Sequence, residues 1–332
     1  SMQFDVEFDS GAFYPAAGAI ELAEIAEDRG FGAVWKGESN STDPIVLLSA
    51  MAARTKRIQL GTAIYHIFGR SPVTMGIQAS TFNDLSDGRL LLGLGVANKN
   101  IAGWHNQQFQ RPLRAIREYA EIVREVATGE ALDYEGELFR TGKFKLSWKP
   151  KHREVKILFA GLGEQMTRLA GKTSDGIVVN LANPAKVREI VANVSDGARQ
   201  VGRDPSRIEY VVKVRVVVNK DREVAKNKLK QVLTFYNLAD HYKDMVVDMG
   251  YGEENRTIQE AYRSGGFKAA QAAVSERLLE GLPTIAATSV EEVRERVQPW
   301  IDAGATRLLI PTVPVTDDPV AETKEFLKLW RL

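Results

Sequence analysis

The feature of this sequence that most limits its fold is the regular alternation of short apolar runs with longer amphipathic stretches. In the amphipathic stretches, apolar residues recur at every third or fourth position, which is the spacing of a helix with one buried face. The run at 90–96 contains no polar side chain, as is typical of parallel strands that are covered on both faces. The runs, often rich in β-branched residues, occupy 4–8, 33–36, 58–64, 90–96, 155–160, 177–180, 208–218 and 308–313. The alternation therefore predicts a parallel α/β fold.

Cap residues mark where several of the helices begin and end. Asp43 and Ser71 are each followed by a proline, a pair that suits the N-cap and the first position of a helix. Gly30 follows the first amphipathic stretch and can adopt the left-handed conformation after a helix. Near the C-terminus, the spacing of apolar residues predicts one continuous helix over 290–303.

Eight strands that are each followed by a helix give the count of a (β/α)8 barrel, the TIM barrel. Such barrels typically need about 250 residues. The surplus of this 332-residue chain lies largely in two excursions, a hairpin-like one at about 130–153 and a mainly helical one at about 221–281. We predict a single domain over 1–332. The alternative is a doubly wound open sheet, which normally has a glycine-rich turn after its first strand, whereas this chain has Asp9-Ser10-Gly11 there.

The composition excludes several classes of partner and site. With 44 basic and 43 acidic side chains the net charge is +1, so we expect no dominant attraction to nucleic acid or to an anionic membrane. The chain has no cysteine and only 4 histidines, none spaced as His-x-x-x-His, so we expect no disulfide and no metal site. We also expect a cytoplasmic location, because nothing indicates an oxidising compartment and no run of about 18 apolar residues could span a bilayer.

The polar residues that follow the strands are the candidates for chemistry, because the active site of a barrel lies at the carboxyl ends of its strands. We expect a small-molecule substrate to bind there. The candidates are Glu7, Asp9, Glu38, His66, Asn98 and Asn180.

Glu7 is the most informative of these residues, because it stands between Val6 and Phe8 in a strand that we expect to be buried. An ionised carboxylate there is unfavourable unless a cation pairs with it or it binds a proton. Two interpretations stay open: a general acid, or a packing partner for a lysine or arginine of a neighbouring strand. His66 is likewise either an acid or a structural histidine. Lys36 offers the lysine that a Schiff-base enzyme such as an aldolase would need.

A glycine-containing turn joins the fifth strand to the next helix. Such a turn lets backbone N–H groups and the helix dipole face a phosphate, although a tight turn without a ligand is the alternative interpretation. The residues of this loop are Gly161, Leu162, Gly163, Glu164 and Gln165.

Motifs spread over nearly the whole chain point to a known family. They are 35–40, Asp43-Pro44, Ala52-Ala53-Arg54-Thr55, 58–64, Arg70-Ser71-Pro72, Leu85-Ser86-Asp87-Gly88-Arg89, Leu92-Gly93-Leu94-Gly95 and Ser174-Asp175-Gly176. Together they resemble the bacterial-luciferase-like superfamily of flavin and deazaflavin oxidoreductases. Within it, the first strand with Glu7, the 161–165 loop and Asn180 are similar to the coenzyme F420-dependent branch typified by methylenetetrahydromethanopterin reductase.

This resemblance implies a (β/α)8 fold, commonly a homodimer, and a site for the deazaflavin coenzyme F420. In that branch, a bulge in the third strand carries a non-proline cis peptide that supports the deazaflavin ring, and the matching pair here is Ala63-Ile64. The resemblance also implies that 161–165 holds the cofactor phosphate, that Asn98 and Asn180 contact the cofactor, and that Glu7 lies near the reacting centre.

Two departures from the family pattern leave the substrate open. The family often has Asp-His where this chain has Glu38-Ser39, and the reductase has an aspartate where this chain has Asn98. The implied activity is hydride transfer between F420 and a small organic substrate, such as a methylene-tetrahydropterin or an alcohol, with Glu7 or Glu38 passing the proton.

Two other functions share the same barrel. One is a two-component monooxygenase that uses FMN, and the other is a protein that binds a flavin or deazaflavin without catalysis. The excursion at 221–281 is either a lid over the substrate or a layer that simply packs against the barrel.

Overall fold

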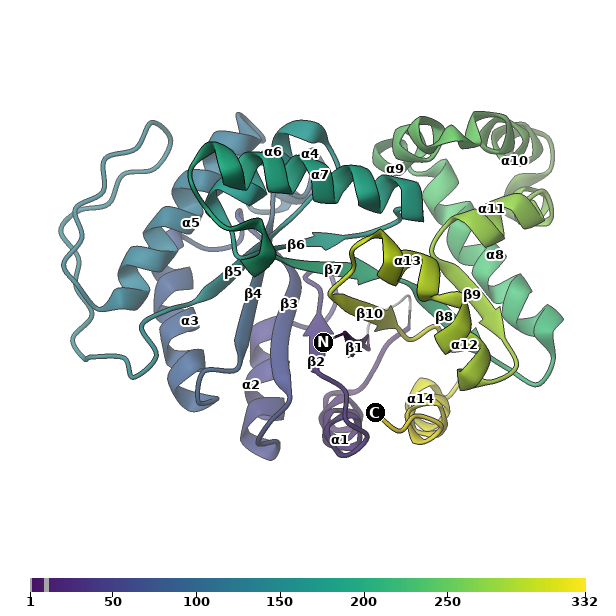
Figure 1. Cartoon of the computed structure of the whole chain (residues 1–332), viewed down its shortest axis with the longest axis horizontal. Coiled ribbons are helices and arrows are strands. Elements are labelled where there is room, and N and C mark those ends of the chain that lie inside the picture. Colours follow the sequence, from purple (N-terminus) through teal and green to yellow (C-terminus); the bar gives the residue numbers. More distant parts are fainter. Residues whose placement is uncertain (1, 9–11) are drawn as a thin grey trace.

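The computed structural model describes residues 2–8 and 12–332, and it contains a closed barrel of parallel strands (Figure 1). Neighbouring strands follow the order β1-β10-β7-β6-β5-β4-β3-β2. The predicted (β/α)8 barrel is thereby confirmed, and the open sheet is excluded. Asp9, a candidate from the sequence, lies outside the described residues. The barrel strands are β1 Gln3–Glu7, β2 Ala33–Lys36, β3 Gln59–His66, β4 Leu90–Gly95, β5 Lys156–Ala160, β6 Gly176–Val179, β7 Glu209–Lys213 and β10 Arg307–Pro311.

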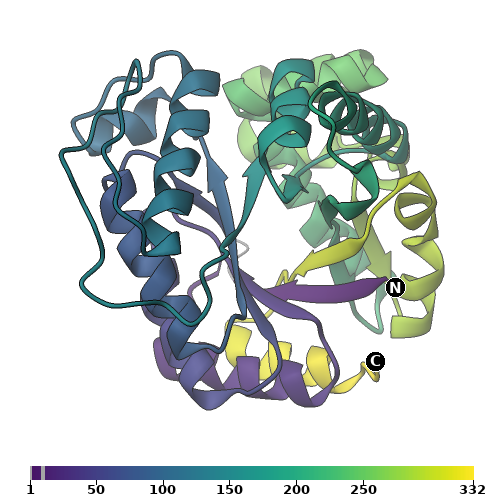
Figure 2. The same cartoon turned by 60° about the vertical axis from the view of Figure 1, so that its left-hand side comes forward.

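Helices surround the barrel, as the amphipathic stretches predict. Asp43 and Ser71 cap α2 and α3 as expected, each accepting a hydrogen bond from the backbone N–H three residues later. The last helix packs beside the first, so the two ends of the chain close the ring (Figure 2). The surrounding helices are α1 Ala16–Asp28, α2 Pro44–Arg54, α3 Pro72–Leu85, α4 Lys99–Trp104, α5 Pro112–Thr128, α6 Glu164–Thr173, α7 Pro184–Gln200, α12 Val290–Arg296, α13 Gln298–Ala303 and α14 Pro319–Lys328.

Side chains alternate between the barrel interior and the helix layer, since successive residues of a strand point to opposite faces. The interior is filled by Trp35 and by smaller apolar residues from the other strands. Trp35 lies against Gly61, where a Cβ would come within 2.3 Å of the indole ring. Lys36 points the other way, with Val34, so the Schiff-base lysine suggested by the sequence does not face the barrel interior.

The prediction of one long strand over 208–218 is wrong. The chain forms β7 and then, after Val214, a separate strand β8 Arg215–Val218, which leaves the barrel. β8 pairs in parallel with β9 Thr284–Ala287 outside the barrel. The sequence stays apolar across the boundary between β7 and β8 because β8 is also buried, partly against a second apolar cluster. The predicted helix over 290–303 is likewise divided at Val297 into α12 and α13.

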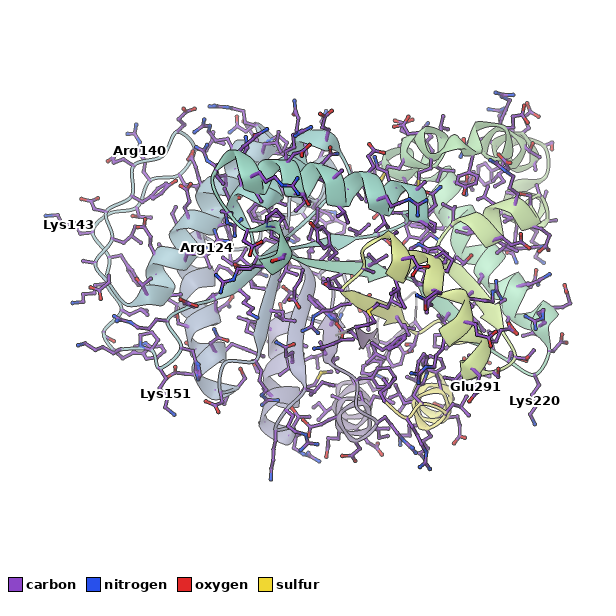
Figure 3. All side chains as sticks on the ribbon, in the orientation of Figure 1. Arg124, Arg140, Lys143, Lys151, Lys220 and Glu291 are labelled. Carbon is purple, nitrogen blue, oxygen red and sulfur yellow. The ribbon has the colours of Figure 1, made fainter. Side chains whose placement is uncertain are left out.

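The two excursions have the predicted character. Residues 130–153 form a hairpin-like extension with antiparallel bridges Leu132–Phe144 and Glu135–Arg140. It projects from the barrel, with Arg140 and Lys143 near its outer edge (Figure 3). The second excursion contains α8 Arg222–Leu238, α9 Asp240–Val246, a π-helical turn Val247–Tyr251, α10 Gly252–Ala272 and α11 Glu276–Gly281. These helices gather at one side of the barrel and bury an apolar cluster of their own.

A buried polar network closes the N-terminal end of the barrel. The carboxylate of Asp5, which is fully buried, accepts hydrogen bonds from Trp35 Nε1 at 2.8 Å and from Arg307 at 3.1 Å. Arg307 also donates to Glu209 at 3.1 Å and to Gln59. Burial raises the pKa of Asp5 to about 6. Because this value is still below neutral pH, the Asp5 carboxylate is ionised there and forms an ion pair with Arg307. None of the helices in the described part of the chain has the length and apolar character needed to cross a membrane.

Candidate active site

The opposite end of the barrel, where the strands have their carboxyl ends, contains a cavity of about 420 Å³. Its volume lies within the range of about 300–1,000 Å³ that is usual for small-molecule sites. The strand ends and the residues that follow them supply most of its wall, and α4 and α9 supply the remainder. The lining residues are Glu38, Ala63, Ile64, His66, Gly95, Val96, Ala97, Asn98, Ile101, Ala160, Gly161, Leu162, Val178, Asn180, Lys213, His241, Tyr242 and Met245.

Most of the residues predicted from the sequence share this wall. Glu38, His66, Ala63, Ile64, Asn98, Gly161, Leu162 and Asn180 all line the cavity. Four predicted residues do not line it. Glu7 lies just behind Lys213, whereas Gly163, Glu164 and Gln165 lie at the exposed start of α6.

Glu38 lies at the centre of a charged cluster on one side of the cavity. Its carboxylate accepts hydrogen bonds from the guanidinium of Arg70 and from the backbone N–H of His66 at 3.1 Å. The His66 ring nitrogen Nε2 lies 3.1 Å from the same carboxylate. Glu38 is therefore held in an ion pair, which opposes its predicted role as a mobile proton carrier. Arg70 belongs to the Arg70-Ser71-Pro72 motif, and nothing in its local sequence indicates that it pairs with Glu38.

The hydrogen bonds of His66 fix its tautomer. The backbone N–H of Phe68 donates to His66 Nδ1 at 3.2 Å, so a neutral ring carries its proton on Nε2, which lies 3.1 Å from the Glu38 carboxylate. Burial lowers the pKa of His66, and this effect outweighs the nearby Glu38 carboxylate, which acts in the opposite direction. His66 is thus a neutral hydrogen-bond donor at neutral pH.

Glu7 pairs with a lysine that sequence reasoning missed. Glu7 Oε2 lies 3.4 Å from Lys213 Nζ, and Lys213 also donates to the carbonyl oxygen of Ala63 at 3.4 Å. Both residues are buried, with exposed fractions of 5% for Glu7 and 9% for Lys213. Lys213 is the last residue of β7 and follows a buried apolar run, the same local signal that singled out Glu7. The ion pair agrees with the packing interpretation of Glu7, but it also places a cation on the cavity wall.

The third strand has the irregularity that the family resemblance implied. The peptide bond between Ala63 and Ile64 is cis. The register of β3 against β4 shifts between Thr62 and Tyr65. Both residues of the cis pair line the cavity. The role of this bulge in supporting a ring system stays a prediction.

The loop at 161–165 leads into α6 with a free N-terminus. Gly163 is the N-cap, and no side chain caps the first amides of the helix. A Cβ on Gly163 would meet nothing within 4 Å, so the space in front of these amides is open. The carboxylate of Glu164 is exposed and pairs with Arg168 at 3.2 Å. Unsatisfied amides at a helix N-terminus attract anions.

Helix α9 of the second excursion forms the outer wall of the cavity. His241, Tyr242 and Met245 face it, and burial raises the pKa of the Tyr242 hydroxyl. The aromatic ring of Tyr242 lies 4.6 Å from that of Tyr236. The excursion thus covers part of the mouth while packing on its own core, and its motion as a lid stays a prediction. The described residues contain no group of three or more acidic or histidine side chains that could hold a metal ion.

A parallel barrel with a polar cavity at the carboxyl ends of its strands has the site of a barrel enzyme. The family described as luciferase-like monooxygenase matches residues 3–307. The chain therefore belongs to that family, and the resemblance drawn from its motifs is confirmed.

Individual relatives extend this result. The chain is 26% identical over 317 residues to the 5,10-methylenetetrahydromethanopterin reductase of Archaeoglobus fulgidus, covering 93% of this chain and 92% of the relative. Its fold matches the coenzyme F420-dependent tetrahydromethanopterin reductase of Methanopyrus kandleri with a TM-score of 0.84 and 23% identity, covering 99% and 98% of the two chains. An F420-dependent secondary alcohol dehydrogenase, solved with an F420-acetone adduct, matches with a TM-score of 0.77 and 20% identity, covering 99% and 98%.

Proposed function

We propose that this protein is an oxidoreductase that transfers a hydride between coenzyme F420 and a small organic substrate. The observation that carries the proposal is that most of the residues predicted for an F420 site line one cavity at the carboxyl ends of the strands. The names of the similar reductases and of the similar alcohol dehydrogenase support the same cofactor. They also support a methylene-tetrahydropterin or an alcohol as the class of substrate.

The residues of the cavity fit a cofactor with a flat ring and an anionic tail. Ala63, Ile64 and Gly95 leave a wall of short or apolar groups against which a ring can lie. The uncapped amides of α6, with open space before Gly163, would hold the phosphate. When bound, F420 supplies the hydride chemistry, and the protein supplies placement and electrostatics.

The ion pair of Glu7 and Lys213 gives this chain a means of handling the accompanying proton. Lys213 lines the cavity, and its Nζ can donate a hydrogen bond to an oxygen or nitrogen of the substrate. Glu7, 3.4 Å behind it, balances the charge. His66 and Glu38 are locked to each other and to Arg70, so we assign them to orientation of the bound molecules.

Spectroscopic titration of the purified chain tests the cofactor. We expect added F420 to shift its absorbance on binding and FMN to bind more weakly. Tight binding of FMN with none of F420 would overturn the proposal in favour of a two-component monooxygenase. Bound F420 without turnover over a broad panel of alcohols and methylene-tetrahydropterins would favour a non-catalytic binding protein.

The proposal includes a cytoplasmic homodimer, as the family resemblance and the absence of cysteine from the sequence suggest. Light scattering coupled to gel filtration measures the subunit count. A monomer over the working range of concentrations would remove the dimer from the proposal and leave the cofactor assignment standing.

A further inference from the structure

One buried cation at the mouth of the barrel has no counter-charge. Arg215 begins β8 and is only 7% exposed. Over residues 2–8 and 12–332, no carboxylate oxygen forms an ion pair with its guanidinium within 4.0 Å. Its partners are neutral: Asn180 Oδ1 accepts a hydrogen bond at 2.9 Å, and the Tyr236 hydroxyl accepts another.

Two other cations close to the cavity are balanced by carboxylates. Arg70 pairs with Glu38, and Lys213 pairs with Glu7. The guanidinium carbon of Arg215 lies 4.9 Å from the centroid of the Tyr236 ring, and such a cation–π contact offsets only part of the cost of burying a charge. A buried charge without a counter-charge is unfavourable. Arg215 therefore gives this part of the wall an excess of positive charge that a bound anion would balance.

Asn180 lies between Arg215 and the cavity. Because its Oδ1 accepts from Arg215, its amide nitrogen must be oriented away from the guanidinium. The amide nitrogen carries two N–H groups. One is donated to the Tyr236 hydroxyl at 3.4 Å, and the other lies on the side of Tyr242, which interacts with Asn180 and lines the cavity together with it. The cavity thus presents an amide donor backed by a guanidinium, an arrangement that favours a charged acceptor.

The position of this donor separates it from the predicted contacts of the cofactor ring and phosphate. Those contacts lie at the ends of β3, β4 and β5, whereas Asn180 and Arg215 lie beyond β6 and β7, beside α9. The family resemblance implied that Asn180 contacts the cofactor, but its place on the β6–β7 side favours a contact with the substrate instead. We propose that this side of the cavity binds a carboxylate of the substrate, which Asn180 contacts directly and whose charge Arg215 balances. The inference rests on the proposed function, because it assumes that the cofactor occupies the β3–β5 side.

Benzoate and benzamide, which have nearly the same shape and differ in charge, are suitable probes. Isothermal titration calorimetry is performed on the F420-saturated full chain at constant ionic strength. We expect benzoate to bind about tenfold more tightly than benzamide, as befits a charge-assisted hydrogen bond. In Arg215→Gln the two affinities become equal, while the affinity for F420 is unchanged. Arg222→Gln removes a guanidinium that pairs with Glu292 outside the cavity, and this control keeps the preference for benzoate.

A second variant covers the case in which Arg215→Gln fails to fold. Asn180→Asp places a carboxylate of the chain itself beside Arg215, so we expect a melting temperature at or above that of the wild type and no preference for benzoate. A purely structural Arg215 predicts that both variants retain the preference, which would overturn the proposal.

Two further outcomes would also overturn it: no preference in the wild type, or a loss of F420 affinity with unchanged benzoate binding in Arg215→Gln. The latter would assign the anion to the cofactor. If the chain binds FMN in place of F420, the proposed function fails, and the same titrations on the FMN-loaded chain still decide the role of Arg215.

Discussion

Asp5 and Glu7 lie two residues apart on the inward face of β1, yet they belong to opposite ends of the barrel. Asp5 faces the closed N-terminal end, where Trp35 and Arg307 donate to it. Glu7 faces the open end, where its partner Lys213 lines the cavity. The two carboxylates share strand, orientation and burial. The comparison shows that burial alone does not decide the role of such an ion pair. A pair at the closed end serves the structure, whereas a pair at the open end lies within reach of a ligand.

The largest effect should follow from breaking the closed end. Arg307→Met leaves Asp5 and Glu209 without their cation, and removal of one partner of a buried ion pair typically costs about 3–5 kcal/mol. We expect a loss of that order in the free energy of unfolding, measured in urea, with an unchanged dissociation constant for F420 in the folded protein. A weaker affinity for F420 with unchanged stability would contradict the division between the two ends.

The matching change at the open end should affect turnover instead. In Glu7→Gln, Lys213 loses the counter-charge that holds it beside the cavity, and we expect turnover to fall by about 100-fold because the proton-transfer group is no longer balanced or oriented. Its affinity for F420 should stay the same. The control is Asp5→Asn, the same change at the closed end, which should lower stability and preserve turnover. Full turnover by Glu7→Gln would remove Glu7 from the mechanism.

The two ends should also respond to pH in opposite directions. Burial raises the pKa of Asp5 from 3.8 to about 6 in the folded state. The folded protein therefore binds this proton more tightly than the unfolded chain does. The resulting stabilisation, on the order of 3 kcal/mol, is fully present below about pH 4 and is lost as the pH rises through about 6.

His66 has the opposite sign, because its pKa is lowered from 6.5 in the folded state. Its contribution is present above pH 6.5 and is lost as the pH falls, since the unfolded chain then binds the proton more tightly. Urea unfolding over this range should show that the stability difference between the wild type and Asp5→Asn shrinks as pH rises. The difference between the wild type and His66→Gln should grow. Slopes of the same sign would contradict the assignment.

The smallest effect on stability should come from the start of α6. Gly163 has the extended backbone of an N-cap, with φ −70° and ψ 157°, and an added Cβ meets no atom within 4 Å. Gly163→Asp should therefore raise stability by a few tenths of a kcal/mol. The new carboxylate would occupy the position proposed for the cofactor phosphate, and we expect about tenfold weaker binding of F420. Gly163→Asn is the control, because it caps the helix without the charge. Unchanged F420 affinity in Gly163→Asp would place the phosphate elsewhere.

Prediction from the local sequence pattern is wrong in this protein where two structural elements succeed each other along the chain and both are buried. The strand predicted over 208–218 reads as one apolar run, although Lys213 ends the barrel strand and Arg215 begins another sheet. Both halves are buried, so the alternation of side chains gives no signal of the break. Arg215 was missed for the same reason, since its counterparts Asn180 and Tyr236 come from distant parts of the chain.

The sequence by itself determined the eight barrel strands in their order, the caps of α2 and α3, the burial of Glu7 and 8 of the residues that line the cavity. These features follow from the period of side chains along each element and from the rule that barrel sites lie at the carboxyl ends of strands. Only the tertiary structure decided which charges meet: Glu7 with Lys213, Glu38 with Arg70, and Asp5 with Arg307. Such ion pairs depend on the closure of the barrel, which brings together residues from strands as far apart in the sequence as the first and the last. The spacing of side chains within one element carries no information about these long-range contacts.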